Sequence, residues 1–103
     1  MAADHPGPAG QDQFVLRLYV TGTTARSTRA IANLRQLCDQ HLPDRYELEV
    51  VDIYQQPELA AREQLVAVPT LIKRLPLPLR RLVGDLSNRR RVLAGLDLSA
   101  ISS

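Results

Sequence analysis

A strand, a helix and a second strand follow one another in the first half of the chain, and this pattern limits the fold more than any other feature. Phe14 to Val20 form an apolar run that is typical of a buried strand covered on both faces. Residues 25–42 carry apolar side chains at helical spacing, and residues 46–53 form a second strand. Because a helix connects them, the two strands should lie parallel with a right-handed crossover. The sequence therefore predicts an α/β fold.

The predicted helix and the strand after it show which sides face solvent. We expect Thr23, Thr24 or Ser27 to cap the start of the helix. Its apolar stripe contains the chain's single cysteine, Cys38, which we expect to pack in the core rather than to react. Polar and apolar residues alternate at the start of residues 46–53, so one edge of this strand should face solvent.

The second half gives less decided local signals. Its expected elements are a short helix, two hairpin strands and a last helix, at residues 57–65, 70–75, 79–83 and 87–96. Pro57 suits the first position of a helix, Pro76 and Pro78 lie in the hairpin connection, and Ser87 is the expected cap of the last helix. The resulting order, βαβαββα, is that of thioredoxin. We predict one thioredoxin-like domain over residues 14–98.

Length and composition exclude several classes of protein. The 103 residues suit a single domain. Residues 1–13 are rich in proline, glycine and small polar side chains, so we expect a disordered N-terminal tail, and residues 99–103 are expected to form a C-terminal tail. A single cysteine excludes an internal disulfide, and no segment resembles a signal peptide or reaches the ~20 apolar residues of a membrane span. We expect a cytoplasmic protein that does not enter membranes.

The thioredoxin comparison does not extend to catalysis. Pro69 lies just before the third strand, where thioredoxin-like folds hold a cis-proline, and the sequence leaves cis and trans open. A thioredoxin also needs a reactive thiol at the turn after the first strand, and residues 22–27 contain no cysteine. His5 and His41 have no metal-ligand partner at useful spacing, and no glycine-rich phosphate loop is present. We therefore predict a binding protein without catalytic residues, cofactor or metal.

A series of short motifs, in a shared order, resembles KaiB, the metamorphic protein of the cyanobacterial circadian oscillator. The match runs from about Phe14 to Leu98. Its main motifs are Leu18-Tyr19-Val20-Thr21-Gly22, Pro57-Glu58-Leu59-Ala60, Val68-Pro69-Thr70-Leu71, Leu75-Pro76-Leu77-Pro78, Gly84-Asp85-Leu86-Ser87 and Gly95-Leu96-Asp97-Leu98. Each motif is weak alone, but their common order over most of the chain is specific.

The resemblance implies a regulator with two folds. One is a self-associated ground state, a dimer or tetramer with the order βαββααβ, and the other is a thioredoxin-like monomer. In the family, the thioredoxin-like form binds the ATPase ring of KaiC, modulates its phosphorylation cycle and recruits or sequesters other clock components, among which a histidine kinase is a further expected partner. The change remodels the C-terminal half, where the local signals are mixed, as two packings of similar free energy would require.

The resemblance also implies roles for single residues, wherever a position of this chain matches a functional position of the family. Basic residues that resemble surface contacts of the family are Arg29, Lys73, Arg80 and Arg81. Residues that resemble the fold-switching positions are Pro69, Pro76, Pro78, Gly95 and Asp97. Gly95 can reach backbone angles that other residues cannot, and Asp97 can cap or destabilise a helix end. The alternatives are a solvated basic surface and an ordinary helix stop.

The second predicted strand departs from the family. It resembles a KaiC-docking edge, but Glu47 and Glu49 stand where the cyanobacterial proteins carry neutral or basic residues. Charge of opposite sign changes the choice of partner, so we expect a KaiC-type ATPase whose surface suits an acidic strand edge. A non-cyanobacterial relative in a simpler timer or stress response fits this departure.

Other functions stay open as alternatives. One is a thioredoxin-fold adaptor in stress or two-component signalling without KaiC, and a related one is the KaiB-like sensor region of a histidine kinase. An oxidoreductase would have to rely on Cys38. Nucleic-acid binding through Arg80, Arg81 and residues 89–91 is disfavoured, because aromatic residues do not interleave with these bases and residues 44–63 are acidic.

Overall fold

The computed structural model describes residues 13–65 and 68–98, which form a four-stranded sheet with three helices. The elements in chain order are β1 (Phe14–Val20), α1 (Ala25–His41), β2 (Tyr46–Asp52), α2 (Pro57–Glu63), β3 (Thr70–Leu75), β4 (Arg80–Val83) and α3 (Arg89–Gly95). This order, βαβαββα, is the predicted thioredoxin-like one. The expected tails lie outside the described residues, apart from residue 13.

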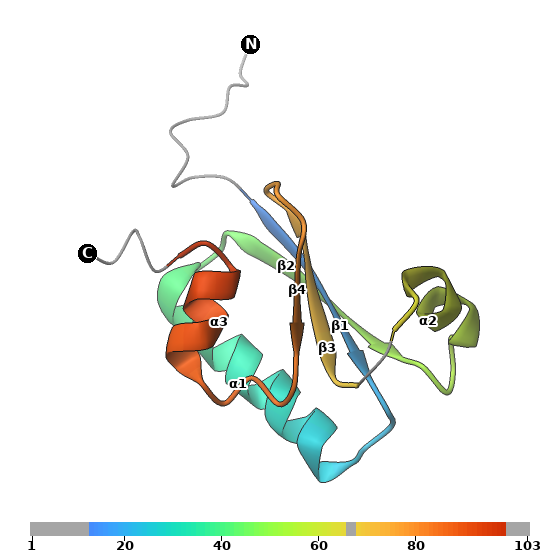
Figure 1. Cartoon of the computed structure of the whole chain (residues 1–103). Helices are drawn as coiled ribbons and strands as arrows, with labels where there is room; N and C mark the ends of the chain where they lie inside the picture. Colours follow the sequence, from blue (N-terminus) through green and yellow to red (C-terminus); the bar gives the residue numbers. More distant parts are fainter. Residues whose placement is uncertain (1–12, 66–67, 99–103) are drawn as a thin grey trace.

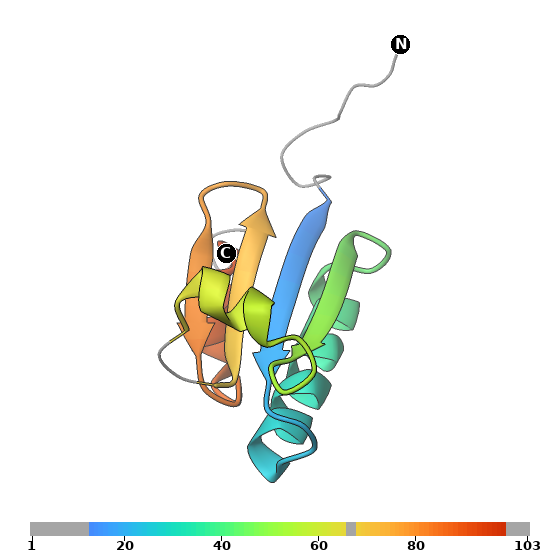
Figure 2. The same cartoon turned by 90° about the vertical axis from the view of Figure 1, so that its right-hand side faces the viewer.

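The sheet has the strand order β2-β1-β3-β4, which places β2 and β4 at its two edges (Figure 1). β1 pairs with β2 in parallel, as the helical crossover requires, and β3 is antiparallel to both β1 and β4. Helices α1 and α3 cover one face of the sheet, and α2 lies on the opposite face (Figure 2). The two faces are therefore covered unequally.

Strand β1 shows how this unequal cover arises from the sequence. Alternate side chains point to opposite faces, so Phe14, Leu16 and Leu18 enter the main core under α1 and α3. On the other face Tyr19 packs in a smaller core with Val51 and Ile72 beneath α2. The expectation that β1 is covered on both faces is only partly right, because α2 has seven residues and leaves Arg17 beyond its reach with a side chain that is 22% exposed.

Helix α1 begins and packs as its sequence predicts. Of the three candidate caps it is Thr24 whose hydroxyl accepts the backbone N–H of Ser27, at 3.3 Å. The buried stripe that faces the sheet consists of Ser27, Ala30, Leu34, Leu37 and Cys38. Cys38 has no solvent exposure, which confirms its place in the core.

The second half differs from prediction at one helix start. Ser87 does not cap α3; the Asn88 side chain accepts the backbone N–H of Arg91 at 3.0 Å instead. The Ser87 backbone N–H donates to Asp85 at 3.1 Å, which places Ser87 in the turn before the helix. The three prolines of the predicted switch set, Pro69, Pro76 and Pro78, each follow a cis peptide bond. None of the helices in the described ranges is long and apolar enough to cross a membrane.

Candidate partner-binding surfaces

The turn that carries the nucleophile in thioredoxins is here a hydrogen-bonded connection without a thiol. The Gly22 N–H donates to Asp52 Oδ1 at 3.2 Å, and the Tyr54 N–H donates to the same oxygen at 2.9 Å. On the other side the Thr21 N–H donates to Ser27 Oγ at 3.1 Å. Asp52 thus accepts from both turns that leave this end of β1 and β2. The arrangement stabilises the turn, and the turn carries no thiol.

The single cysteine is equally unsuited to thiol chemistry. Burial raises the pKa of the Cys38 thiol to about 12, and the neighbouring Asp39 carboxylate adds to this effect. At neutral pH the thiolate, which is the reactive form, is therefore scarce.

We expect Cys38 in the native protein to react with Ellman's reagent at least ~100-fold more slowly than the same thiol in the denatured chain, because attack requires both exposure and ionisation. The reaction is followed by absorbance at neutral pH, with the guanidinium-denatured protein as the reference. Rapid labelling of the native protein, at a rate near the reference, would contradict this placement.

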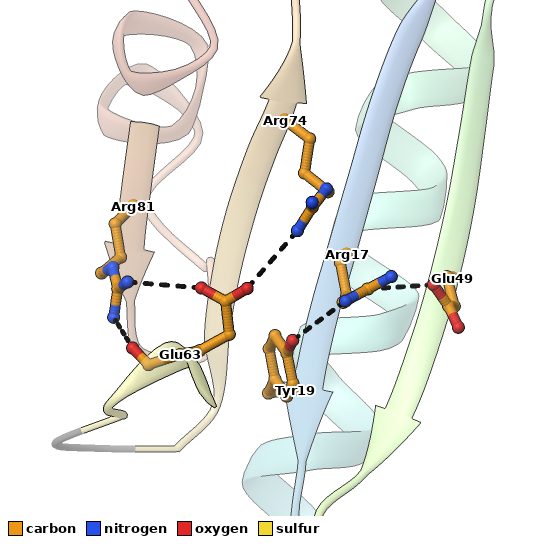
Figure 3. A network of polar contacts seen from close by, with 6 residues as sticks. All are labelled: Arg17, Tyr19, Glu49, Glu63, Arg74 and Arg81. Carbon is orange, nitrogen blue, oxygen red and sulfur yellow. Dashed lines mark hydrogen bonds and ion pairs between the residues drawn. The ribbon is translucent and has the colours of Figure 1, made fainter. Parts of the chain in front are cut away.

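Paired charges occupy the sheet face that α2 leaves uncovered (Figure 3). Arg17 donates to Glu49 at 2.9 Å and to the Tyr19 hydroxyl at 3.3 Å. Glu63, at the end of α2, accepts from Arg74 of β3 at 3.4 Å and from Arg81 of β4 at 3.5 Å. We call this surface the open sheet face. Its ion pairs are partly exposed, so each contributes little to stability and leaves polar groups available to a partner.

The acidic residues of β2 lie at an edge of the sheet, as predicted. In the ranges that the structure covers, Glu47 makes no ion pair, whereas Glu49 pairs with Arg17. Beside this edge the open sheet face is hollowed by about 290 Å³. The hollow is lined by Val15, Leu16, Arg17, Glu47, Leu48, Glu49 and Arg74. An edge strand that carries Glu47 outside any ion pair of the described residues, beside a hollow, is suited to binding a protein strand or loop.

The structure does not bring all four predicted basic residues together, although Lys73 and Arg80 both contact Asp97. Arg29 lies on α1 and pairs with Asp85 at 3.4 Å, and Arg81 lies on the open sheet face. The expectation that Lys73 lies on the surface is wrong for this fold, because its side chain is 1% exposed. Strand alternation explains the difference: Lys73 follows Leu71 by two residues and points to the same buried face.

Lys73, Asp97 and Arg80 form a charged cluster that sequence analysis did not find. Lys73 Nζ lies 2.5 Å from Asp97 Oδ2, and Arg80 Nη2 lies 3.1 Å from Asp97 Oδ1. The Lys73 hydrogen bond, together with that of Arg80, lowers the pKa of Asp97. Asp97 follows α3 with φ of 62°, so the cluster joins the end of the last helix to strands β3 and β4. The signal available in sequence was the alternation that turns Lys73 inward.

Gly95 serves close packing rather than an unusual backbone angle. It is the last residue of α3, and its φ is not in the left-handed region, which among glycines of the described ranges holds only Gly22 and Gly84. A Cβ added at Gly95 would lie 2.6 Å from both terminal carbons of Leu82. The expectation that Gly95 reaches special backbone angles is therefore wrong in this fold, and the glycine instead lets α3 approach β4.

Comparison with known proteins shows the family of the chain that carries these surfaces. The family model described as the KaiB domain matches residues 17–98, which is most of the chain. The chain belongs to the KaiB family. The circadian clock protein KaiB3 of Synechocystis sp. is 48% identical over 87 residues, covering 84% of this chain and 85% of the relative. The circadian clock oscillator protein KaiB of Synechococcus elongatus is 46% identical over 85 residues, covering 82% and 83%.

Solved structures share the fold of this KaiB-family chain. The N-terminal domain of Synechococcus elongatus SasA has a TM-score of 0.68 at 22% identity and covers 93% of this chain and 94% of that domain. Chloroplastic thioredoxin z has a TM-score of 0.70 at 16% identity and covers 89% and 83%. These likenesses establish a thioredoxin-like fold. The KaiB relatives are clock proteins, which act as regulators rather than catalysts, and a regulatory clock role is accordingly supported for this chain.

Proposed function

We propose that this chain is a non-catalytic clock or timer regulator that binds a KaiC-type ATPase ring, modulates its phosphorylation cycle and recruits further clock components. Membership of the KaiB family supports the role, and the position of β2 carries the proposal. β2 pairs only with β1 among the described strands, so its outer edge is available to another chain. Backbone groups along such an edge can add a partner strand, while the side chains select the partner.

The charges of β2 define the surface that the ring must present. The strand carries Glu47, Glu49 and Asp52 and no basic residue. Arg17 pairs with Glu49, and Asp52 accepts the Gly22 and Tyr54 N–H groups, so among the described contacts Glu47 is the acid of this strand without a partner. We therefore propose that the docking site on the ring is basic or rich in hydrogen-bond donors. A matching charge accelerates association and excludes rings with an acidic surface.

The direct test mixes the purified chain with the KaiC-type ATPase of the same genome and separates the mixture by size-exclusion chromatography. The mixtures contain ATP, ADP or a non-hydrolysable analogue, because the ring's nucleotide state sets its surface. We expect co-elution in at least one state and a changed time course of ring phosphorylation. Absence of a complex in every nucleotide state contradicts the proposal. The chain alone, run in parallel, tests the predicted dimer or tetramer.

Glu47→Lys is expected to weaken the complex by about tenfold, because it replaces the uncompensated acid at the docking edge with a like charge. Fluorescence anisotropy of the labelled chain against the ring measures the dissociation constant. Glu58→Lys is the matched control: it makes the same charge change on an exposed residue of α2, away from the β2 edge. Equal weakening by both variants would show that only net charge matters and that β2 is not the docking edge.

A further inference from the structure

A second hollow lies beside β4, the edge strand opposite to β2. It has a volume of about 290 Å³ and opens between the start of α1 and the connection from β4 to α3. Figure 1 shows this connection lying against α1, where the Asn33 side chain donates to the Asp85 carbonyl at 2.9 Å. Most of its lining is polar, and Leu82, Leu86 and Val92 contribute apolar side chains.

Two arginines that line this hollow have no side-chain partner in the part of the chain that the structure describes. Arg26 comes from the first turn of α1 and Arg91 from α3. Within residues 13–65 and 68–98, neither side chain makes an ion pair or a hydrogen bond. A guanidinium carries five N–H donors in a planar fork that matches a carboxylate. We call this feature the Arg26–Arg91 hollow.

The one acid that lines the hollow is already engaged. Asp85 Oδ1 accepts the Ser87 N–H at 3.1 Å, and Asp85 Oδ2 lies 3.4 Å from Arg29 Nε. The hydrogen bonds from Ser87, followed by Arg29, lower the pKa of Asp85, so it stays ionised and its charge is met by Arg29. The charges of Arg26 and Arg91 are left in excess.

The surrounding helices strengthen this positive potential. α1 and α3 together carry six arginines and a single acid, Asp39. The β2 edge carries three acids and no base. Charge of one sign gathered around a hollow raises the local concentration of ligands of the other sign.

We propose that the Arg26–Arg91 hollow binds an acidic segment of a partner protein, with an aspartate or glutamate carboxylate held between the two guanidiniums and a neighbouring aliphatic side chain against Leu82, Leu86 and Val92. The three apolar side chains favour a peptide over a nucleic-acid backbone, and among the described residues no aromatic side chain lines the hollow to stack a base. The site does not use β2, so it stands whether or not the ring binds there. One chain then has docking sites at both edges of its sheet.

The test is an NMR titration of the ¹⁵N-labelled full chain with capped octapeptides in which Asp-Leu, Glu-Leu, Asp-Val or Glu-Ile lies between glycine and serine residues. We expect at least one to give saturable shifts at the amides of residues 84–88, Arg26 and Arg91. Replacing its acid with the amide should abolish these shifts. Arg26→Gln combined with Arg91→Gln should weaken binding about tenfold.

Arg35→Gln combined with Arg90→Gln is the matched control, since both arginines are exposed on the same helices but do not line the hollow. The amide spectrum of each variant must retain the wild-type shifts of the β1–β3 pair, which shows that the thioredoxin-like fold is the one titrated. Four results would each overturn the proposal: no saturable shifts with any of the peptides, equal binding of the amide peptide, equal weakening by the control pair, or tighter binding of inorganic phosphate, duplex DNA or anionic vesicles at the same amides. If the chain binds the peptide but not the ring, the proposed function fails while this proposal stands, so the two can be distinguished.

Discussion

Asp97→Asn is expected to lower the free energy of unfolding of the thioredoxin-like domain by about 2 kcal/mol, whereas Lys73→Met is expected to change it much less. The asymmetry follows from burial. The Lys73 side chain is 1% exposed and Asp97 is 38% exposed. Removing the carboxylate leaves a buried ammonium without its counter-ion, which is costly. Removing the ammonium leaves a carboxylate that water reaches and that Arg80 still pairs with.

Urea denaturation followed by circular dichroism measures both variants, and its pH dependence provides a second readout. Because the folded-state pKa of Asp97 is lowered, its contribution is complete above the unfolded-state value of about 3.9 and disappears as the pH falls through the folded-state value. The difference between wild type and Asp97→Asn should therefore be constant near neutrality and shrink below about pH 4. A difference independent of pH, or a larger loss in Lys73→Met, would argue against the ion pair.

Gly95→Val is expected to lower the free energy of unfolding by about 2 kcal/mol, because a branched side chain cannot enter the contact between α3 and β4 without displacing Leu82. The ideal Cβ position lies 2.6 Å from both Leu82 terminal carbons and 2.9 Å from its Cγ. Overlap at Cγ means that the whole side chain must turn away from its partly buried position. Urea denaturation again measures the effect.

The decisive comparison is a double-mutant cycle with Leu82→Ala. Truncating Leu82 removes the atoms that a new Cβ would meet, so adding Gly95→Val to Leu82→Ala should cost much less than adding it to the wild type. An additive cycle would instead mean that the valine acts through the backbone of α3. In that case close packing against β4 would not be the reason for the glycine.

The first half of the fold was predictable because its local signals agree with the tertiary structure. The apolar run of β1 indicates a buried strand, the alternation at the start of β2 and the apolar stripe of α1 each select one face, and a helical crossover leaves only a parallel pair. The sequence offers three candidates for the N-cap of α1, and the structure shows that Thr24 is the cap. The local sequence pattern does not indicate how much of the sheet a short helix such as α2 covers. The exposed part of Arg17 depends on that coverage.

The candidate sites were predicted less well because they depend on pairs of residues far apart in the chain. The order of the motifs indicates the family, and the charges of the second strand, which depart from the family, indicate the acidic edge. Glu47 and Glu49 lie on the edge strand β2. A lysine is usually exposed, so sequence alone predicts Lys73 at the surface. Its partner, Asp97, lies 24 residues later in the chain, and local spacing does not indicate that the two meet. The hollow between Arg26 and Arg91 likewise forms only when α3 comes to rest beside α1. Sequence spacing contains no direct record of such contacts.

Strand β2 carries only acids, whereas α1 and α3 carry six arginines and one acid, and this uneven distribution of charge has a dipole component. A dipole in the field of a charged partner experiences a torque, so the chain turns towards its bound orientation before any atoms touch. At 0.1 M salt this alignment acts over about 10 Å, the Debye length. The search for the right orientation, which slows most protein associations, is thereby shortened. A higher salt concentration screens the charges and lowers the association rate again. The distribution of charge sets the rate and the orientation of association, while the β2 edge and the Arg26–Arg91 hollow determine which partners bind.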